Sequence, residues 1–389
     1  MKRTRRLGLL VVGLAHVLTA SPIAAADPLP RARPDALGLS SARLGRIGQV
    51  LERDVGSGRM PGAVVAIARR GKLVYYEAFG FLDKAAGVRM PKDAIFSLAS
   101  MTKPMTGVAT LLLQEEGHLH LAEPAAKYLP ALGKMRVGVA SSGADAQAAS
   151  APKTVPLRVP ISIQDLMAHT AGMAYGFSGK SPLNKLWPNT AGDFARTLDS
   201  KAFIESIAAL PLLHQPGSVW EYSVSNDVLG VLVEAVAGKP LGKYLDQRVF
   251  APLGMRDTGF VIPADKVKRH ARALPKDPET GANQVLMDAT TPPRFDCGGA
   301  CAVSTAADYL RFAQMLLDRG RFGNVRILGR KSVELMTNDH LGTDIRNTAV
   351  EADPTRRGVG YGLTVSVRTD PGVSPYLGSR GEFGWGGAY

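Results

Sequence analysis

The stretch "FSLASMTKPMTG", residues 96–107, places a serine, a lysine and a proline directly before an apolar run at residues 108–113. Proline is tolerated in the first turn of a helix, because its missing N–H would have no partner there anyway. Pro104 therefore predicts a helix that begins at or just before Ser100, and we expect that helix to end at Gly117.

The predicted helix start places Ser100 and Lys103 where they can act as a nucleophile and its base. Backbone N–H groups at a helix start are unpaired and can hold an oxyanion. Lys103 lies three residues on, shares the face of Ser100 and can reach its hydroxyl. Burial and a nearby helix N-terminus both disfavour the ammonium form, so the amine can take a proton. Because a serine needs such a base to become nucleophilic, we predict Ser100 as nucleophile and Lys103 as its base.

The Ser-x-x-Lys spacing alone is not specific. "SAPK", which begins at Ser150, also matches, but it lies in the small, polar segment "ASSGADAQAASAP" and begins no apolar helix. For Ser100 the alternative interpretation is a helix cap beside a solvated lysine. The apolar helix that follows Ser100 favours the catalytic interpretation.

The first 26 residues have the pattern of a secretory signal peptide. Four cations among residues 2–6 precede an apolar stretch at residues 7–20, and "SPIAAADP" then offers an Ala-x-Ala cleavage site after Ala26. The alternative, a membrane anchor, needs about 20 apolar residues, which this stretch does not supply. We therefore expect a leader at residues 1–26, one domain at residues 27–389, and a periplasmic location without a stable membrane anchor.

The charge of the chain does not indicate a nucleic-acid partner. The formal charge of +13 falls to +9 without the leader, because the leader holds four cations and no acid. The remaining basic residues are scattered, as in Arg69-Arg70 and Arg330-Lys331, and are not interleaved with aromatic residues. This pattern favours a solvated surface. The sequence leaves the oligomeric state open.

Cys297 and Cys301 frame the segment "CGGAC". In an oxidising compartment a small loop closed by a disulfide is expected, since the glycines let the backbone turn tightly. The alternative is a pair of buried thiols, and the compartment makes us favour the disulfide. We expect no metal, because no second cysteine pair or histidine cluster supplies four ligands, and we expect no cofactor.

Hydrophobic patterns predict strands at both ends of the chain and helices between them. A capped helix follows Ser40, and "GAVVAIARRGKLVYYEAFG" then reads as two strands joined by a tight turn. "YGLTVSVRT", residues 361–369, alternates like one strand. We expect an α+β or α/β fold, with a mixed antiparallel sheet built from both ends, flanking helices and a mostly helical insert at about residues 120–290. The chain stops at "GEFGWGGAY", which has the pattern of a central strand, so we expect a fragment.

A set of motifs along the chain resembles one known family. The motifs are "SMTK", "GHLHLAEPAAKYLP", "ISIQDLMAHTAGM", "PGSVWEYS" and "FGWGGAY", in this order. Together they are similar to the serine beta-lactamase superfamily, and closest to its class C-like branch, which contains the family VIII carboxylesterases. The match spans nearly the whole chain after the leader. It implies a beta-lactamase-like fold.

The resemblance assigns a role to Tyr222. The second motif of the family is a tyrosine in a Tyr-x-Asn context, which here is Tyr222 in "WEYSVSN". A phenol can relay protons between serine, lysine and leaving group. From the residues alone we would prefer a buried aromatic ring with a satisfied hydroxyl. Val224 replaces the asparagine of the pattern and removes a side-chain amide that could grip a substrate amide.

The third family motif is normally Lys-Thr-Gly or His-Thr-Gly on a strand that lines the site. We place it at Trp385-Gly386-Gly387, where glycines would let the backbone approach a substrate, and we expect the N–H of Ala388 to join that of Ser100 in an oxyanion hole. The alternative is an ordinary glycine-rich turn. Trp385 brings no cation for the carboxylate of a beta-lactam, so the resemblance favours uncharged esters.

These observations predict a periplasmic serine hydrolase that cleaves small carboxylic esters through an acyl-enzyme on Ser100. The alternative enzyme is a class C-like beta-lactamase or a D-alanyl-D-alanine carboxypeptidase. A catalytically silent protein that binds cell-wall peptides or a partner is the alternative outside enzymes, and the intact serine, lysine and tyrosine argue against it. No Gly-x-Ser-x-Gly motif is present, which argues against an α/β-hydrolase. His169 occupies a family position that looks structural.

Overall fold

The computed structural model describes residues 27–139, 152–284 and 287–388. The expected leader and Ser150 lie outside the described residues. The α-helices are α1 (Ser41–Gly56), α2 (Lys103–Glu115), α4 (Ile163–Ala168), α5 (Ser200–Ala208), α6 (Ser225–Ala237), α7 (Leu241–Leu245), α8 (Ala251–Leu253), α9 (Ala306–Leu317), α10 (Arg330–Met336) and α11 (Thr348–Ala352). The strands are β1 (Gly62–Arg69), β2 (Lys72–Asp83), β3 (Val88–Arg89), β4 (Phe96–Ser97), β5 (Val137–Gly138), β6 (Thr154–Val155), β7 (Val219–Trp220), β8 (Val303–Ser304), β9 (Arg321–Phe322), β10 (Val325–Arg326), β11 (Arg346–Asn347), β12 (Val359–Tyr361), β13 (Ser366–Arg368) and β14 (Phe383–Gly384).

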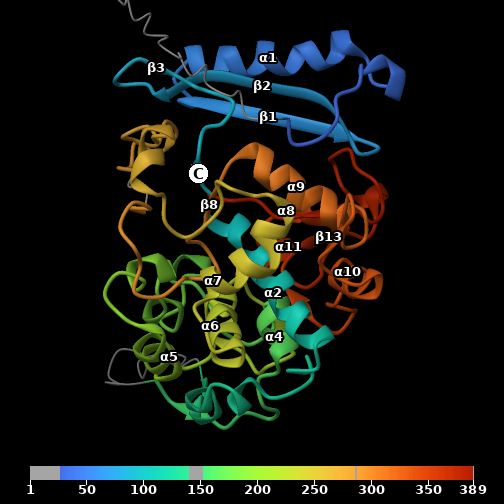
Figure 1. Ribbon diagram of the computed structural model, residues 1–389. Helices are drawn as coiled ribbons and strands as arrows, with labels where there is room; N and C mark the ends of the chain where they lie inside the picture. Colours follow the sequence, from blue (N-terminus) through green and yellow to red (C-terminus); the bar gives the residue numbers. More distant parts are fainter. Residues whose placement is uncertain (1–26, 140–151, 285–286, 389) are drawn as a thin grey trace, which may run out of the picture.

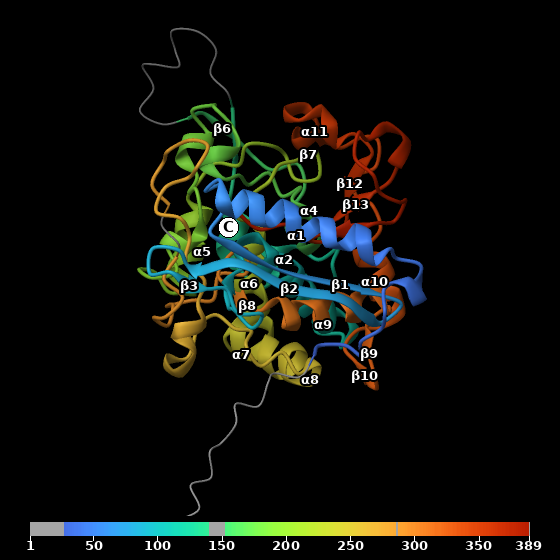
Figure 2. The ribbon, with the colours of Figure 1, turned by 90° about the horizontal axis from the view of Figure 1, so that it is seen from above.

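The N-terminal elements form a layer over the rest of the molecule. Ser40 caps α1 by accepting the N–H of Arg43, and β1 and β2 pair antiparallel around a turn at Arg70 and Gly71, both with positive φ. The helix α1 covers one side of this hairpin, while α9 packs against β1 on the other (Figure 1). Seen from above, α1 runs along the hairpin (Figure 2). The predicted capped helix and hairpin are therefore confirmed.

Helix α2 is the centre of the core. Every residue from Lys103 to Leu113 is buried, and α6 packs alongside (Figure 1). Burying a leucine or valine side chain stabilises the fold by about 1.5–3 kcal/mol, so this helix is held firmly. Ser100 lies in a 3₁₀ turn, Ala99–Thr102, and the α-helix begins only at Lys103. The helical conformation thus begins just before Ser100 as expected, but its first turn is 3₁₀ and the α-helix starts three residues later than Ser100.

The C-terminal strands differ from expectation in two ways. Residues 361–369, expected as one strand, are divided between β12 and β13, because Thr364 has a φ of 69° and turns the chain into a hairpin. Within the described residues, β1–β2–β3 and β12–β13–β14 also form two separate three-stranded sheets rather than one. The pairing is mixed as expected, since β7 and β11 pair parallel and the other pairs of named strands antiparallel.

The middle of the chain is mostly helical. Helices α4 to α8 lie between residues 163 and 253, with only the short strand β7 among them in this described stretch, and the two-residue strands β5 and β6 precede α4. Helix α4 ends at Ala168, because His169 takes a left-handed conformation that stops the helix and returns its N–H to Asp165. The division into a main domain and an insert at about residues 120–290 stays a prediction.

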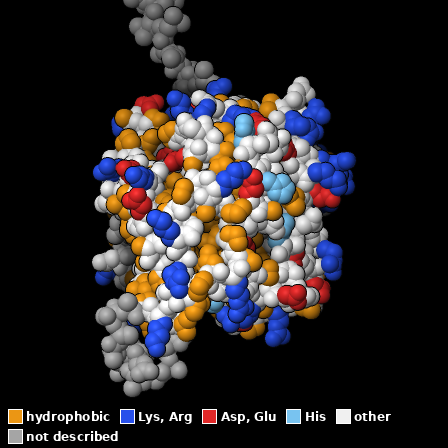
Figure 3. Space-filling model, turned by 90° about the horizontal axis from the view of Figure 1, so that it is seen from below, with side chains coloured by type: hydrophobic (Ala, Val, Ile, Leu, Met, Phe, Trp, Pro, Cys, Tyr) orange, Lys and Arg blue, Asp and Glu red, His pale blue; other side chains and the backbone are white. Residues whose placement is uncertain are grey.

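The surface shows no concentration of positive charge on the face seen from below. Lys and Arg side chains are spread over that face among hydrophobic ones (Figure 3). Among the described helices, none is long and apolar enough to cross a membrane.

The contact between α2 and the β12–β13 hairpin gives a stability prediction. A Cβ added at Gly107 would lie 2.3 Å from Oγ1 of Thr364. We expect Gly107→Ala to lower the free energy of unfolding by about 1–3 kcal/mol, as overpacking does. Thr364→Gly removes the clashing side chain, and glycine adopts the positive φ freely. Urea unfolding should therefore show the double variant to be more stable than Gly107→Ala, whereas additive losses would contradict this contact.

Candidate active site

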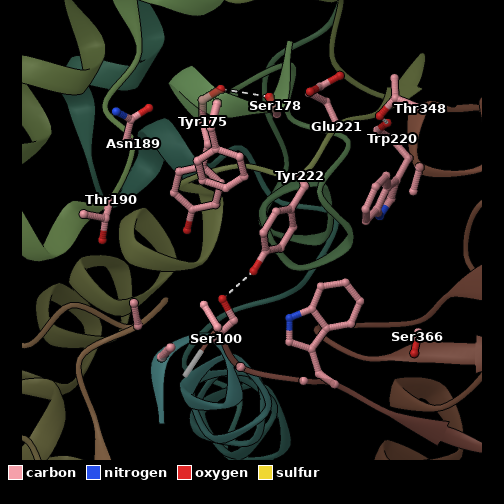
Figure 4. Close-up of a pocket in the computed structure, with 18 of the residues that line it drawn as sticks. Ser100, Tyr175, Ser178, Asn189, Thr190, Trp220, Glu221, Tyr222, Thr348 and Ser366 are labelled. Atoms are coloured by element: carbon pink, nitrogen blue, oxygen red, sulfur yellow. Dashed lines mark hydrogen bonds between the residues drawn. The ribbon is translucent and has the colours of Figure 1, made fainter. Parts of the chain in front are cut away.

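Three predicted residues meet at the start of α2. The hydroxyl of Tyr222 donates a hydrogen bond of 2.6 Å to Oγ of Ser100, and Nζ of Lys103 lies 3.1 Å from the same oxygen. The close-up shows the ring of Tyr222 pointing at Ser100 (Figure 4). A hydroxyl, an amine and a phenol therefore converge although Tyr222 is 122 residues away from the serine in sequence.

A strained turn holds Ser100 in place. Ala99 has a φ of 45°, a conformation that costs an L-residue other than glycine about 1–2 kcal/mol. Thr102 fixes the turn by donating its hydroxyl to the carbonyl of Ala99 and accepting the N–H of Ala302. The N–H of Leu98 in turn donates to the carbonyl of Ala302. The segment next to β8 thus supports the serine.

The amine of Lys103 is completely buried, so protein groups surround it. Its Nζ lies 2.8 Å from the carbonyl oxygen of Gly299 and 3.3 Å from the hydroxyl of Tyr175. The hydroxyl of Tyr175 donates to Oδ2 of Asp227 at 3.4 Å, and the N–H of Gly299 donates to Oδ1 at 2.8 Å. Sequence reasoning missed Tyr175 and Asp227. The sequence did contain a signal for Asp227, because an acidic residue directly precedes the apolar run of α6. It contained no signal for Tyr175.

Burial sets the protonation of this network. It raises the pKa of the Asp227 carboxyl from 3.8 to about 6, against the lowering effect of the Lys103 charge and of the hydrogen bonds. Burial also raises the pKa of Tyr175 well above 10, and the neighbouring Asp227 charge adds to this shift. Above pH 6, Asp227 is therefore a carboxylate and Tyr175 a phenol.

The ring of His169 packs against the ring of Tyr222. Burial and, second, the Lys103 charge lower the pKa of His169 well below 6.5, so the ring is neutral. Nε2 lies 3.1 Å from the amide nitrogen of Asn226, which only donates, so the hydrogen is on Nδ1 and faces the hydroxyl of Ser223 at 3.0 Å. The ring centroids of His169 and Tyr222 are 5.0 Å apart. This packing fits the structural role expected for the histidine.

The third motif, Trp385-Gly386-Gly387, lines the same cavity as Ser100, and so does Ala388, which follows it. The ring of Trp385 lies 5.4 Å from that of Tyr222. A Cβ at Gly387 would lie 2.3 Å from the carbonyl oxygen of Leu98, so only glycine allows this approach. Val224, where the family pattern has asparagine, is buried at the start of α6 and packs in the core.

Ser100 opens into a cavity of about 1530 Å³. Aromatic rings line it, and the ring of Phe177 stacks on that of Tyr175 at 5.1 Å. Asn189 and Thr190 lie on one side of the serine, across from Thr348 and Ser366 (Figure 4).

Each described arginine of the cavity wall has a carboxylate within 4 Å, and Nη1 of Arg368 is buried without a hydrogen-bond partner. The pairs are Arg196 with Asp288 at 2.8 Å, Arg356 with Asp353 at 3.4 Å, and Arg368 with Glu382 at 3.2 Å. Paired cations are poorer partners for a substrate anion than free ones. A carboxylate-bearing substrate would therefore compete with these protein carboxylates for the cations of the wall.

Cys297 and Cys301 are joined by a disulfide, and both are buried. The loop that they close contains Gly299, which contacts Lys103. In the described parts of the chain, no group of three or more His, Cys, Asp or Glu side chains is arranged to hold a metal ion.

With this geometry in place, comparison with known proteins gives a clear result. The family model described as Beta-lactamase matches residues 47–389. The chain belongs to the Beta-lactamase family. The resemblance predicted from the motifs, and the fold that it implies, are therefore confirmed, and the protein has the fold of the serine hydrolases of this family.

Relatives within the Beta-lactamase family include esterases. Protein Rv1367c of Mycobacterium tuberculosis (strain ATCC 25618 / H37Rv) is 39% identical, over 86% of this chain and 82% of that protein. Esterase EstB of Burkholderia gladioli is 30% identical, over 92% of this chain and 88% of that protein. The solved structure of EstCE1, a hydrolase with promiscuous acyltransferase activity, is similar with a TM-score of 0.69 and 27% identity, covering 88% and 87% of the two chains.

Replacing the buried carboxylate should change how stability depends on pH. Because the folded pKa of Asp227, about 6, exceeds 3.8, the folded state binds more protons between these values, and stability falls as pH rises through them. Asp227→Asn carries no charge. We expect its free energy of unfolding, relative to wild type, to rise between about pH 4 and pH 7 by up to about 3 kcal/mol and then to level off. Urea unfolding across this range measures the difference, and a constant difference would contradict the buried charge.

Proposed function

We propose that this protein is a serine hydrolase that cleaves carboxylic esters through an acyl-enzyme on Ser100. The observation that carries the proposal is the placement of one hydroxyl 3.1 Å from a buried amine and 2.6 Å from a phenol. An exposed cap serine would need neither partner. The names of EstB and EstCE1 support an ester substrate.

In the proposed first step, Oγ of Ser100 bonds to the ester carbonyl carbon while Lys103 takes the hydroxyl proton. The backbone N–H groups of Ser100 and Ala388 would stabilise the oxyanion, a contribution worth about 3–4 kcal/mol per donor in such sites. Collapse breaks the bond to the alcohol, which leaves with a proton relayed through Tyr222. Water then attacks the acyl-enzyme by the reverse proton path and releases the acid and Ser100.

Uncharged esters fit this cavity better than beta-lactams. The carboxylate of a beta-lactam needs a cation, but the third motif offers Trp385 and the described arginines of the wall are paired. Val224 supplies no amide to bind a peptide bond. A class C-like beta-lactamase or a D-alanyl-D-alanine carboxypeptidase is the second candidate, favoured by the family fold and by a 26% identical relative from Escherichia coli (strain K12) that is named "Putative D-alanyl-D-alanine carboxypeptidase". The substrate would be a small molecule, and the proposed steps use no cofactor.

We also propose that the protein is exported to the periplasm through the leader at residues 1–26. The disulfide between Cys297 and Cys301 supports this, because disulfides persist in oxidising compartments. Expressed with its leader in a Gram-negative host, the protein should appear in the periplasmic fraction with Asp27 as its first residue. Intact mass of the purified protein checks the cleavage site, and an uncleaved cytoplasmic product would contradict it.

The substrate class can be tested with two chromogenic compounds. We expect kcat/KM for 4-nitrophenyl butyrate to exceed that for nitrocefin by about 100-fold, since about 3 kcal/mol of missing anion binding costs a factor of about 100. Much faster turnover of nitrocefin would favour the beta-lactamase.

The catalytic residues are tested with the same ester. Ser100→Ala should abolish turnover, and Tyr222→Phe should lower kcat by about 10²- to 10⁴-fold, the usual value of a proton-transfer group. Labelling with a fluorophosphonate probe separates an enzyme from a silent binder. A folded wild-type protein without an adduct on Ser100 would favour the binder.

A further inference from the structure

The segment closed by the Cys297–Cys301 disulfide, here called the disulfide ring, is wedged between α2 and α6. The hydroxyl of Thr106 in α2 donates to the carbonyl of Gly298 at 2.7 Å. On the other side, the N–H of Gly299 donates to Asp227 in α6 at 2.8 Å. The disulfide ring therefore touches both helices that form the floor of the site.

The two glycines of the disulfide ring are required by this close fit. A Cβ at Gly298 would lie 2.6 Å from the carbonyl oxygen of Asn226, and one at Gly299 would lie 2.4 Å from Oδ2 of Asp227. Neither position has room for a side chain. The two glycines of "CGGAC" thus allow the backbone of the disulfide ring to pack directly against α6.

The close approach brings one carbonyl to the amine of Lys103. The carbonyl oxygen of Gly299 lies 2.8 Å from Nζ, which is the shortest of its three polar contacts. The hydroxyl oxygens of Ser100 and Tyr175 lie 3.1 and 3.3 Å from Nζ. In the form that accepts the serine proton, the amine has two N–H groups and one lone pair. If Gly299 and Tyr175 accept the two N–H groups, the lone pair points at the hydroxyl of Ser100, which is the direction a base needs.

Asp227 fixes both acceptors at once. Its Oδ1 accepts the N–H of Gly299 and its Oδ2 accepts the hydroxyl of Tyr175. Because the hydroxyl of Tyr175 donates its hydrogen bond to Asp227, the hydroxyl oxygen can accept a hydrogen bond from the Lys103 amine. When Lys103 takes the serine proton, the carboxylate also lies close enough to interact with the new charge, as the effect of Lys103 on the pKa of Asp227 indicates.

We propose that the disulfide ring is a positioning element for Lys103: it clamps the Gly299 carbonyl so that the lysine lone pair faces Ser100. This inference rests on the proposed serine hydrolase function. The two cysteines do not touch the substrate, and their bond acts through Gly299. Without it, the segment is free to move its carbonyl away from the amine, and the base loses its orientation.

The chain contains only two cysteines, so one bond can be changed without side effects on others. We would prepare Cys297→Ala/Cys301→Ala and, separately, wild type reduced with a phosphine, which is oxidised as the disulfide becomes two thiols. Both should lower kcat for 4-nitrophenyl butyrate and the rate of fluorophosphonate labelling of Ser100 by about 10- to 100-fold, as misplacement of a catalytic group does. KM should change less than kcat, because Ala300 is the part of the disulfide ring that lines the cavity, whereas Gly299 contacts the amine.

Three controls make the result specific. The reductant should have no effect on Cys297→Ala/Cys301→Ala, and reoxidation should restore reduced wild type. Leu111→Ala destabilises the same helix α2 without removing a polar group and should keep the wild-type kcat below its unfolding temperature. If the double variant does not fold, reduced wild type carries the test.

The outcomes separate the two proposals. An active wild type whose reduced or double-variant form is folded and keeps its kcat and labelling rate would overturn the positioning role alone. A wild type that neither hydrolyses esters nor labels at Ser100 would overturn the serine hydrolase function, and this inference with it.

Discussion

A lysine amine in the dry interior of a protein has to find all its hydrogen-bond partners within the chain, and this requirement organises the site. Lys103 has no exposed surface, and the oxygens of Ser100, Tyr175 and Gly299 surround its Nζ. An unpaired buried polar group costs about 1–3 kcal/mol, and more when it is charged. The contacts of Lys103 are therefore conditions for folding as well as for the proposed catalysis.

The partners of Lys103 come from distant parts of the chain, so the site exists only in the assembled fold. Helix α2 carries the lysine, α6 carries Asp227, and the segment around β8 supports the turn at Ser100. The strained φ of Ala99 persists because these neighbours hold it. Stability of the core and orientation of the reactive groups are thus supplied by the same contacts.

The sequence revealed the parts of the site that are local. Ser100, Lys103 and Pro104 lie within one turn, so spacing alone brings the serine and lysine together. Tyr222 was found only through the family resemblance, because its approach depends on packing over 122 residues. Tyr175 had no signal for the same reason.

The fold was predictable to a similar extent, because helix caps and alternating patterns are local signals. The hairpin turn at residues 361–369 was missed because threonine rarely adopts the positive φ that Thr364 has here. The disulfide could be expected from the leader and the two cysteines. The contact of Gly299 with Lys103 could not, since it depends on how the ring sits against α6.

The wall of the cavity is formed by other segments of the chain than its floor. Asn189, Thr190 and Arg356 belong to segments outside α2, α6 and the disulfide ring, which hold Lys103, Asp227 and Gly299. Substitutions in these wall segments can therefore reshape the cavity without touching the groups around the Lys103 amine. Such a layout lets the choice of ligand be altered separately from the proposed chemistry.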